Sequence, residues 1–344
     1  MGTSAASIDI QTLARWLASN LEGFEGPVEV EKFSGGQSNP TYRLRTPGGD
    51  YVLRSKPPGP VLNNAHAIDR EFRVMQALAS HVPVPRVRRL CEDPSVIGRN
   101  FYVMDFVEGD ILWQPDLPEI ERNRRPAYYR ALAESLAALH AVDPTSVGLE
   151  NFGKGSGYLE RQISRWTRQY LADEQAGRTD RMDQVARWLA DNAPVSTDVS
   201  IVHGDYRVNN VMFKPSEPQV VAILDWELST LGNPATDFAY HLMKYRIPAG
   251  IPGGGLKGLD LPELNIPTED EHMQTYCDRS GRSEIPHLQF HITFNIFRFA
   301  AIVHGIKGRL LRGTASSDRA GAVADALETY VDLAWNEARR AGMK

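Results

Sequence analysis

The spacing of apolar residues changes along the chain from a mixed pattern to a helical one. Near the start, Ile10, Leu13 and Leu17 share one helical face, and Ser7 stands in the position of an N-cap. A further helix is expected in the segment 66–82, which the following prolines end. Alternating segments predict strands at 28–33, 41–45, 51–55, 87–91 and 100–107.

From Glu108 onward the long apolar patterns are helical. They predict helices at 122–141, 158–176, 181–191, 235–245, 286–312 and 315–341. The segment 246–270 is rich in Gly and Pro and is expected to be a long loop. We therefore expect an α+β fold of two lobes, a sheet-rich N-lobe (1–107) and a mainly helical C-lobe (108–344), with a crossover near 106–110.

Composition places the chain among ordinary globular proteins. Of its 344 residues, 42% are hydrophobic and 24% are charged. The net charge of −5 argues against a nucleic-acid partner, and no apolar run approaches the roughly 18 residues of a membrane span. Cys91 and Cys277 are too few for a disulfide framework, and the N-terminal segment lacks a signal-peptide pattern, so a cytoplasmic location is expected.

The segment IVHGDYRVNNVMF (201–213) places a polar loop between two apolar shoulders that are expected to be short strands. Asp205 and Asn210 are five residues apart, which is the spacing of the Asp and Asn in a kinase catalytic loop. In such a loop the Asp faces the attacking hydroxyl and the Asn binds magnesium. Arg207 could neutralise charge on a transferred phosphoryl group. The alternative is a solvated turn in which His203 is satisfied by backbone.

A second carboxylate, Asp225, follows the unbroken apolar run VVAIL (220–224). A carboxylate at the end of a buried strand, shortly after the catalytic loop, is where a kinase keeps its main magnesium ligand. Trp226 and Glu227 then replace the Phe-Gly of protein kinases. We expect Glu227 either to contact the acceptor or a neighbour of the metal site, or to cap local backbone.

A phosphate-binding loop is expected in FSGGQSNPTYRL, between the first two predicted strands. Glycines there let backbone amides approach phosphate oxygens, and a plain hairpin is the alternative. The residues expected at the nucleotide are Ser34, Gly35, Gly36, Gln37, Ser38 and Asn39.

A cation on the following strand is expected to hold the α- and β-phosphates. Either Arg54 or Lys56 could serve, and Arg54 is favoured. Its expected partner is Glu71, because this carboxylate lies in the apolar stripe of the next helix and an inward-facing Glu needs a cation. The stripe consists of Ile68, Glu71, Met75 and Leu78. A surface ion pair of Glu71 with Arg70 or Arg73 is the alternative.

The strand NFYVMDFV is expected to lead into the crossover between the lobes. There the backbone from Asp105 through Phe106 to Val107 could bind an adenine edge, with Met104 and Phe106 as apolar walls. A nearby motif needs a different interpretation: GLENFGKG (148–155) almost matches the Walker phosphate loop, but it lacks the final Ser or Thr and follows a helix. We expect it to be an ordinary loop.

Taken in order, SGGQSNPTYRL, VLRSKPPG, the Glu71 helix, HGDYRVNN and ILDWE resemble the aminoglycoside phosphotransferase/choline kinase-like superfamily. A narrower similarity is to the kinase-like domains of acyl-CoA dehydrogenase family members 10 and 11 and their free-standing bacterial relatives. It covers VLRSKPPGPVLNNAHAIDREFRVMQAL, YLERQISRWTRQY, DWELSTLGNPATDFAYHL and HGIKGRLLRGTASS.

This resemblance implies a two-lobed, protein-kinase-like fold that uses ATP and Mg²⁺ to phosphorylate a small-molecule hydroxyl. For the closer relatives it implies the hydroxyl of a 4-hydroxyacyl-CoA. Carried over by position, Asp205 is the catalytic base, which His203 supports from behind, and Asn210 and Asp225 are the metal ligands. Arg54 and Glu71 form the phosphate-holding pair, with Arg54 in place of the kinase lysine.

The acceptor is the most open part of the prediction. Acidic and basic side chains are nearly balanced from Leu231 onward, which argues against a polycationic aminoglycoside. Side chains that would suit an anionic acceptor such as a CoA thioester are Arg298, Lys307, Arg309 and Arg312, unless they form a solvated helix face. Further candidates are Tyr158, Arg161, Arg165 and Trp166, although Trp166 could equally pack between helices.

Two classes of function therefore remain. The first is an active kinase, with a hydroxyacyl-CoA as preferred acceptor and an aminoglycoside or another small alcohol as alternatives. The second is a nucleotide-binding pseudokinase. The joint presence of Asp205, Asn210, Asp225 and Glu71 favours the first, because a binding module has no need of the whole set.

Overall fold

The computed structural model describes residues 8–33, 39–57, 68–315 and 319–344. The chain forms two compact units. The first combines Met1–Asp110 with Met212–Ser229, and the second combines Ile111–Val211 with Thr230–Lys344. The division thus differs from the expected N-lobe and C-lobe, because the segment Met212–Ser229 groups with the N-terminal part of the chain.

The first unit contains a five-stranded antiparallel sheet in the order β1-β2-β3-β5-β4. Its strands are β1 (Glu29–Lys32), β2 (Thr41–Arg45), β3 (Tyr51–Ser55), β4 (Val87–Cys91) and β5 (Phe101–Asp105). All five lie within the predicted strands, and β2 and β3 pair as the expected hairpin. Period-two alternation therefore identified every strand of this sheet.

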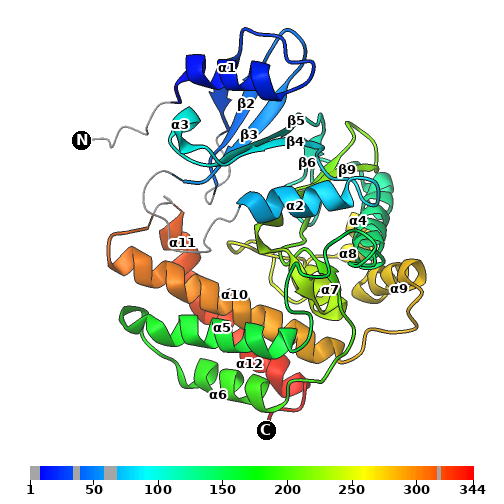
Figure 1. Ribbon diagram of the computed structural model, residues 1–344. Coiled ribbons are helices and arrows are strands. Elements are labelled where there is room, and N and C mark those ends of the chain that lie inside the picture. The colour runs from blue at the N-terminus through cyan, green and yellow to red at the C-terminus, as the bar shows by residue number, and fades with distance from the viewer. Residues whose placement is uncertain (1–7, 34–38, 58–67, 316–318) are drawn as a thin grey trace. The chain divides into compact units, whose positions relative to one another are not determined.

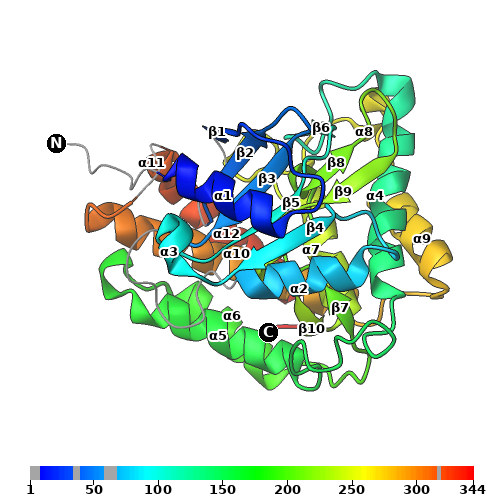
Figure 2. The ribbon, with the colours of Figure 1, turned by 45° about the horizontal axis from the view of Figure 1, so that its top comes forward.

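Two helices pack on opposite faces of this sheet. Helix α1 (Ile10–Asn20) packs with the short α3 (Pro94–Ile97) over the face that carries Leu53 and Phe101 (Figure 2). Helix α2 (Ile68–Leu78) contacts β4 and β5. Since successive side chains of a strand point to opposite faces, Arg54 and Tyr102 face α2.

The start of α1 departs from the sequence-based expectation. Asp9 is the N-cap, and its carboxylate accepts the N–H groups of Gln11 and Thr12 at 3.0 and 3.1 Å. The expected cap, Ser7, lies outside the described residues. Ile10 is 47% exposed and does not share the buried face of the helix, because it is the first helical residue next to the cap.

A second, three-stranded sheet explains why the segment Met212–Ser229 groups with the first unit. Strands β6 (Asp110–Ile111), β8 (Val211–Phe213) and β9 (Val220–Ile223) pair in the order β6-β8-β9. The Ile223 N–H donates to the Pro83 carbonyl at 2.8 Å. Trp226 follows in a 3₁₀ turn, Trp226–Leu228, which packs against α2 and leaves this indole 1% exposed.

The second unit is mainly helical. Its longer helices are α4 (Arg125–His140), α5 (Tyr158–Ala172), α6 (Asp180–Asp191), α7 (Pro234–Leu242), α9 (Glu269–Ser280), α10 (Leu288–Leu311) and α12 (Leu327–Arg340). Helix α10 packs against α5, α7 and α12, as Figure 1 shows for α5. It is buried along most of its length, which explains why its sequence is apolar on nearly every face. Strands β7 (Ser200–Val202) and β10 (Thr230–Gly232) form an antiparallel pair.

Two helical predictions need correction. The segment expected to be a long loop contains the short α8 (Leu261–Leu264) and the start of α9, whose capping box joins Thr268 and Glu271. The expected helix at 315–341 is broken into α11 (Ala320–Asp325) and α12, which meet at Ala326. The motif GLENFGKG lies in turns and irregular structure, as predicted. Within the described part of the chain, no helix has the length and apolar character that crossing a membrane requires.

Candidate active site

The loop HGDYRVNN lies in the second unit, between β7 and a 3₁₀ turn, Val208–Asn210. Asp237 on α7 holds its first turn: the carboxylate accepts the N–H of His203 at 2.7 Å and that of Gly204 at 2.8 Å. Gly204 has φ +81°, a conformation that favours glycine. The loop is therefore fixed at its start by a buried carboxylate.

The charge of Asp237 is itself stabilised inside the unit. Burial would raise the pKa of this carboxyl, but a hydrogen bond from His140 at 3.2 Å and the neighbouring His203 outweigh burial and lower the pKa. The other ring nitrogen of His140 bonds the Tyr276 hydroxyl at 2.7 Å. Asp237 can thus remain an acceptor for the loop amides over the physiological pH range.

Asp205 is held by three side chains. The Tyr240 hydroxyl donates to Oδ1 at 2.5 Å, and the Asn210 amide donates to Oδ2 at 3.0 Å. The Arg207 Nε lies 3.4 Å from the same Oδ2. The Asp205 side chain keeps 17% of its surface exposed, so this carboxylate is both oriented and reachable from solvent.

The geometry of Asn210 agrees with a metal-binding role. Its Nδ2 donates to the backbone oxygen of Asp205 at 2.9 Å as well as to the Asp205 carboxylate. This commitment of the nitrogen leaves Oδ1 without a donor among the described residues. An amide oxygen held in this way is a ligand that Mg²⁺ accepts.

His203 lies behind the loop and is fully buried. Its Nδ1 accepts the backbone N–H of Asp205 at 3.2 Å, and its ring meets Tyr206 edge to face. A solvated turn, the alternative considered from the sequence, does not agree with this burial.

Arg298 and Trp166 also lie near this loop. Arg298 on α10 is 6% exposed and donates from Nη2 to the Gly204 carbonyl at 2.7 Å. Its guanidinium lies 4.9 Å from the centroid of the Tyr240 ring and 5.3 Å from that of Trp166. Arg298 is therefore not part of a solvated helix face. Trp166 is 6% exposed and packs in the core of the unit, which agrees with the helix-packing alternative.

The first unit holds the second group of expected site residues. The Arg54 guanidinium lies 2.7 Å from Glu71 and 2.7 Å from Asp225, so one cation bridges two carboxylates. Glu71 is 1% exposed and also accepts hydrogen bonds from Tyr102 at 3.0 Å and Asn39 at 2.7 Å. The surface-pair alternative for Glu71 does not agree with this burial.

Burial and charge act against each other at this ion pair. Burial raises the pKa of Glu71, and Asp225 adds to the effect, whereas the Arg54 guanidinium opposes it. For Arg54, burial favours the neutral form, but the carboxylates of Glu71 and Asp225 outweigh it and raise the pKa. Arg54 therefore stays charged, and neither carboxylate lacks a counter-charge.

Asp225 adopts the left-handed conformation, with φ +63° and ψ +63°. Asp tolerates this region better than most residues, and such strain is often found at functional sites. Its Oδ1 accepts the Arg54 bond, while Oδ2 has no donor among the described residues. With 34% of the side chain exposed, this second oxygen can accept a cation.

The nucleotide contacts expected from the sequence have mixed outcomes. Ser34, Gly35, Gly36, Gln37 and Ser38 lie outside the described residues. Asn39 is fully buried on Glu71, where its side chain supports the ion pair. Lys56 follows the end of β3, and it is Arg54 that forms the ion pairs with Glu71 and Asp225.

The backbone expected to bind adenine is partly committed within the protein. The Asp105 N–H donates to the backbone carbonyl of Arg86 at 2.9 Å, and the Phe106 N–H donates to that of Asp50 at 3.2 Å. With these two N–H groups engaged, the Val107 N–H is the one of this stretch that has no acceptor among the described residues. Met104 is buried, while the Phe106 ring is covered by the Arg43 guanidinium at 4.2 Å.

The other expected acceptor contacts are spread over the chain. Arg161 on α5 is exposed and donates to the carbonyls of Ser156 and Lys154 in the turn before its helix. Arg309 is exposed, eleven residues after Arg298 on α10, which corresponds to about 16 Å along the axis. Glu227 lies in the 3₁₀ turn that follows Asp225.

Sequence reasoning missed several residues that shape these clusters. Asp237 and Tyr240 were read only as part of a helical pattern, although an Asp inside the apolar run NPATDFAYHL is a signal for a buried polar contact. Tyr102 was read only as a strand residue, and His140 gave no signal of its own.

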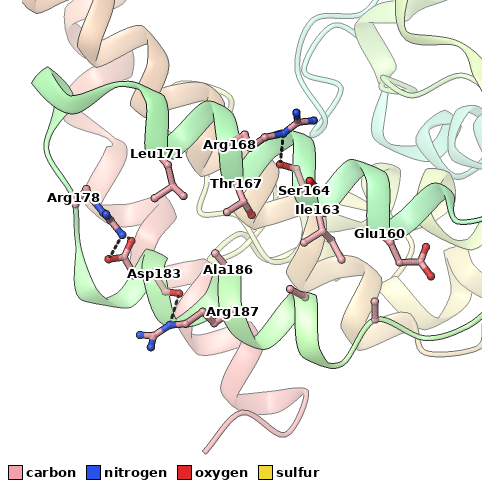
Figure 3. Close-up of a pocket in the computed structure, with 12 residues that line it drawn as sticks. Glu160, Ile163, Ser164, Thr167, Arg168, Leu171, Arg178, Asp183, Ala186 and Arg187 are labelled. Atoms are coloured by element: carbon pink, nitrogen blue, oxygen red, sulfur yellow. Dashed lines mark hydrogen bonds and ion pairs between the residues drawn. The ribbon is translucent and has the colours of Figure 1, made fainter.

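A cavity of about 700 Å³ lies elsewhere in the second unit, between α5 and α6 (Figure 3). Thr167 and Leu171 on α5 and Ala186 on α6 point into it, and the Arg178–Asp183 ion pair lies at one end. None of the catalytic-loop residues lines it, so this cavity is separate from the candidate active site.

Comparison with known proteins finds relatives both by sequence and by structure. The chain is 42% identical over 321 residues to mouse acyl-CoA dehydrogenase family member 10, covering 93% of this chain and 30% of that protein. It is 43% identical to chicken acyl-CoA dehydrogenase family member 11, covering 90% of this chain and 41% of that protein. The chain thus spans less than half the length of these relatives.

Solved structures resemble the whole chain. A Ralstonia eutropha protein assigned as an aminoglycoside phosphotransferase has a TM-score of 0.88 and 43% identity, with 97% of this chain and 99% of that chain covered. An aminoglycoside phosphotransferase in complex with AMP-PNP and hygromycin B has a TM-score of 0.61 at 15% identity, with 95% and 99% covered, which shows the fold alone.

The model of the phosphotransferase enzyme family matches residues 29–257. This range contains HGDYRVNN, Asp225 and the Arg54–Glu71 pair. The expected α+β, kinase-like fold and the resemblance read from the sequence are both confirmed. The chain belongs to the phosphotransferase enzyme family.

Proposed function

We propose that this protein is an ATP- and Mg²⁺-dependent kinase that phosphorylates the hydroxyl of a small molecule. The observation that carries the proposal is the state of Asp205: a carboxylate oriented by Tyr240 and Asn210, yet still exposed to solvent. A general base needs this combination of fixed geometry and access. A module that only binds nucleotide has no need of it.

The residues take the following roles in the proposal. Asp205 accepts the proton of the acceptor hydroxyl, and His203 positions its backbone. Arg207 stabilises negative charge on the group being transferred. ATP bound with Mg²⁺ would supply the phosphoryl group. Asn210 and Asp225 would be the metal ligands, since each has one oxygen left without a donor in the described part of the structure.

The nucleotide would be held by the first unit. Arg54, kept in place by Glu71, is the cation for the phosphates, with Lys56 as the alternative. The Val107 amide is the donor for the purine edge, and Met104 supplies an apolar wall. Residues 34–38 are proposed to wrap the phosphates through their backbone amides.

For the acceptor we favour a 4-hydroxyacyl-CoA. Identities of 42% and 43% to parts of acyl-CoA dehydrogenase family members support a link to acyl-CoA chemistry. The alternative acceptor is an aminoglycoside or another small alcohol, which the assignment of the Ralstonia protein favours. We place the reaction in the cytoplasm, because both cysteines are free and buried.

A first experiment measures ADP release with ATP, Mg²⁺ and a panel of hydroxylated acceptors. The panel contains 4-hydroxypentanoyl-CoA, hygromycin B and simple diols. We expect ADP release that depends on the acceptor. Replacing Asp205 by Asn removes the base but keeps the shape, so turnover should fall by about 100- to 10,000-fold.

Binding of a non-hydrolysable ATP analogue, measured by calorimetry, is the control for this variant. It should stay within about twofold of the wild type if Asp205→Asn affects only the chemical step. Wild-type protein that binds the analogue but releases no ADP with any acceptor would favour the pseudokinase instead.

A further inference from the structure

Two arginines of the second unit share one aromatic ring. The guanidinium carbons of Arg165 and Arg298 lie 5.2 and 5.3 Å from the centroid of the Trp166 ring. Arg165 and Trp166 are neighbours on α5, and Arg298 comes from α10, which packs against α5. We call Arg165, Trp166 and Arg298 the arginine–tryptophan cluster.

The positive charge of this cluster has no counter-charge in the described residues. Neither Arg165 nor Arg298 forms an ion pair with a carboxylate there, although Arg298 is 6% exposed. Arg54 and Arg246, by contrast, are paired with carboxylates. The buried Arg99 and Arg125 form no ion pair among the described residues either, but both donate from Nε to a neutral oxygen. A buried cation without an anion is costly, so the pattern calls for a ligand that supplies one.

Two buried donors of the cluster also lack an acceptor. Arg298 Nε and Trp166 Nε1 are both buried, and no described group accepts a hydrogen bond from either. The Arg298 charge acts on its surroundings as well: burial lowers the pKa of Arg165, and the Arg298 charge lowers it further. Both observations describe a site that is short of negative charge and of acceptors.

The cluster lies one side chain away from the catalytic loop. The Arg298 guanidinium covers the Tyr240 ring at 4.9 Å, and the Tyr240 hydroxyl donates to Asp205. Arg298 also donates to the Gly204 carbonyl, directly before Asp205. A group bound by the cluster would therefore lie within reach of a small acceptor whose hydroxyl is at Asp205.

We propose that the arginine–tryptophan cluster is a specificity subsite that binds an anionic group, a carboxylate or phosphate, carried by the acceptor near its reacting hydroxyl. The inference rests on the proposed kinase function but not on the acyl-CoA acceptor favoured above, because a thioester has no charge near the hydroxyl. It requires an acceptor with a free anionic group at that position. Guanidinium groups suit carboxylates and phosphates because they donate two parallel hydrogen bonds. A polycationic acceptor would meet like charge at this position.

The test compares acceptors that differ only in charge. The acid 4-hydroxypentanoate and its amide carry the same hydroxyl, and 4-hydroxypentanoyl-CoA provides a neutral acyl group with distant phosphates. We expect the wild-type kcat/KM to be at least about tenfold higher for the acid than for the amide, with a preference that weakens as salt is added. Arg165→Gln should reduce this ratio about tenfold, mainly through KM, and Arg165→Lys should restore part of it.

Arg168→Gln is the matched control, because it removes one positive charge from an exposed position of the same helix, where Arg168 donates to the Ser164 carbonyl. It should keep the wild-type ratio. Arg165→Gln is preferred to a change at Arg298, since Arg298 also holds Gly204 and its loss would lower activity with every acceptor. An acid-to-amide ratio that is equal in wild type and Arg165→Gln would overturn the subsite while leaving the kinase proposal intact.

Calorimetry with 4-oxopentanoate, which has no hydroxyl, separates the subsite from the reaction. Binding that Arg165→Gln weakens about tenfold supports the subsite even if no acceptor is phosphorylated. Inorganic phosphate is titrated in parallel to distinguish the source of the anion. Binding of either anion that depends on Arg165 supports the subsite and identifies the anion, whereas no dependence of either on Arg165 would contradict an acceptor subsite.

Discussion

Asp225 shows how one residue can combine backbone strain with an ion-binding side chain. Its left-handed φ of +63° turns the chain directly after β9, and its carboxylate meets Arg54 at 2.7 Å. Such a conformation persists only where the surroundings support it. Here the support comes from Arg54 and from Trp226, whose indole donates to the Ile223 carbonyl at 2.9 Å.

The substitution Asp225→Asn tests the metal role without adding backbone strain, because Asn also tolerates the left-handed region. We expect Asp225→Asn to weaken Mg²⁺-dependent binding of an ATP analogue at least about tenfold. Binding measured in EDTA should change much less. Glu217→Gln, which removes an exposed carboxylate of the same unit, is the control. An unchanged Mg²⁺ titration would rule out Asp225 as a ligand.

At the scale of elements, α7 and α9 enclose an unusual group of bases. Lys244, directly after α7, lies 3.1 Å from His241 Nε2, which in turn lies 2.9 Å from His272 Nε2 on α9. Burial lowers the pKa of Lys244 to about 7. Burial also lowers the pKa of both histidines, and the Lys244 charge adds to this effect. The packing of these elements has therefore buried both histidines and left Lys244 only partly exposed.

This group makes the free energy of unfolding depend on pH. Between about pH 7 and 10.5 the unfolded chain holds a proton on Lys244 that the folded chain lacks, so stability rises with pH across this window. Below about pH 6.5 the histidines act in the same direction, and stability falls as pH falls. For one fully coupled proton the slope is at most about 1.4 kcal/mol per pH unit.

Urea denaturation of wild type and Lys244→Met between pH 7 and 10 isolates the lysine contribution. The variant should show a flatter rise of the unfolding free energy with pH than the wild type. Lys214→Met is the control, since Lys214 is half-exposed and paired with Glu217. Parallel curves for wild type and Lys244→Met would contradict a depressed lysine pKa.

At the scale of the whole molecule, the first unit is made from two separated stretches of chain. Met212–Ser229 adds β8, β9 and the buried Trp226 to Met1–Asp110. A fragment of residues 1–110 alone should therefore melt about 10 °C or more below one in which a Gly/Ser linker joins 1–110 to 212–229. Circular dichroism follows both transitions. Equal melting temperatures would show that the second stretch contributes little.

The same discontinuity shows what the sequence could and could not predict. Local patterns located the strands, most helices and the inward position of Glu71, because period and apolar stripes are properties of neighbouring residues. The grouping of 212–229 with the first unit depends on contacts far apart in sequence, such as Ile223 with Pro83.

The roles of side chains were likewise predictable where the interacting residues are close in sequence. The inward-facing Glu71 predicted its contact with Arg54, which the structure contains. The spacing of Asp205 and Asn210 placed both in one loop, where a hydrogen bond joins them. Tyr240 and Asp237 act on the loop from a distant helix. The sequence left Arg298 open between an acceptor contact and a solvated helix face, and the burial of α10 excludes the second. Chemistry that is local in sequence was predictable, whereas support from distant elements was not.

Synthesis on the ribosome gives the divided first unit a further consequence. Nascent domains usually fold in order as they emerge, but this one must wait while the roughly 100 residues of Ile111–Val211 are made. At about 5–20 residues per second, the delay is about 5–20 s. Throughout that time the surface of α2 that will receive Trp226 is uncovered, so this interval is when a nascent chain would most need a chaperone.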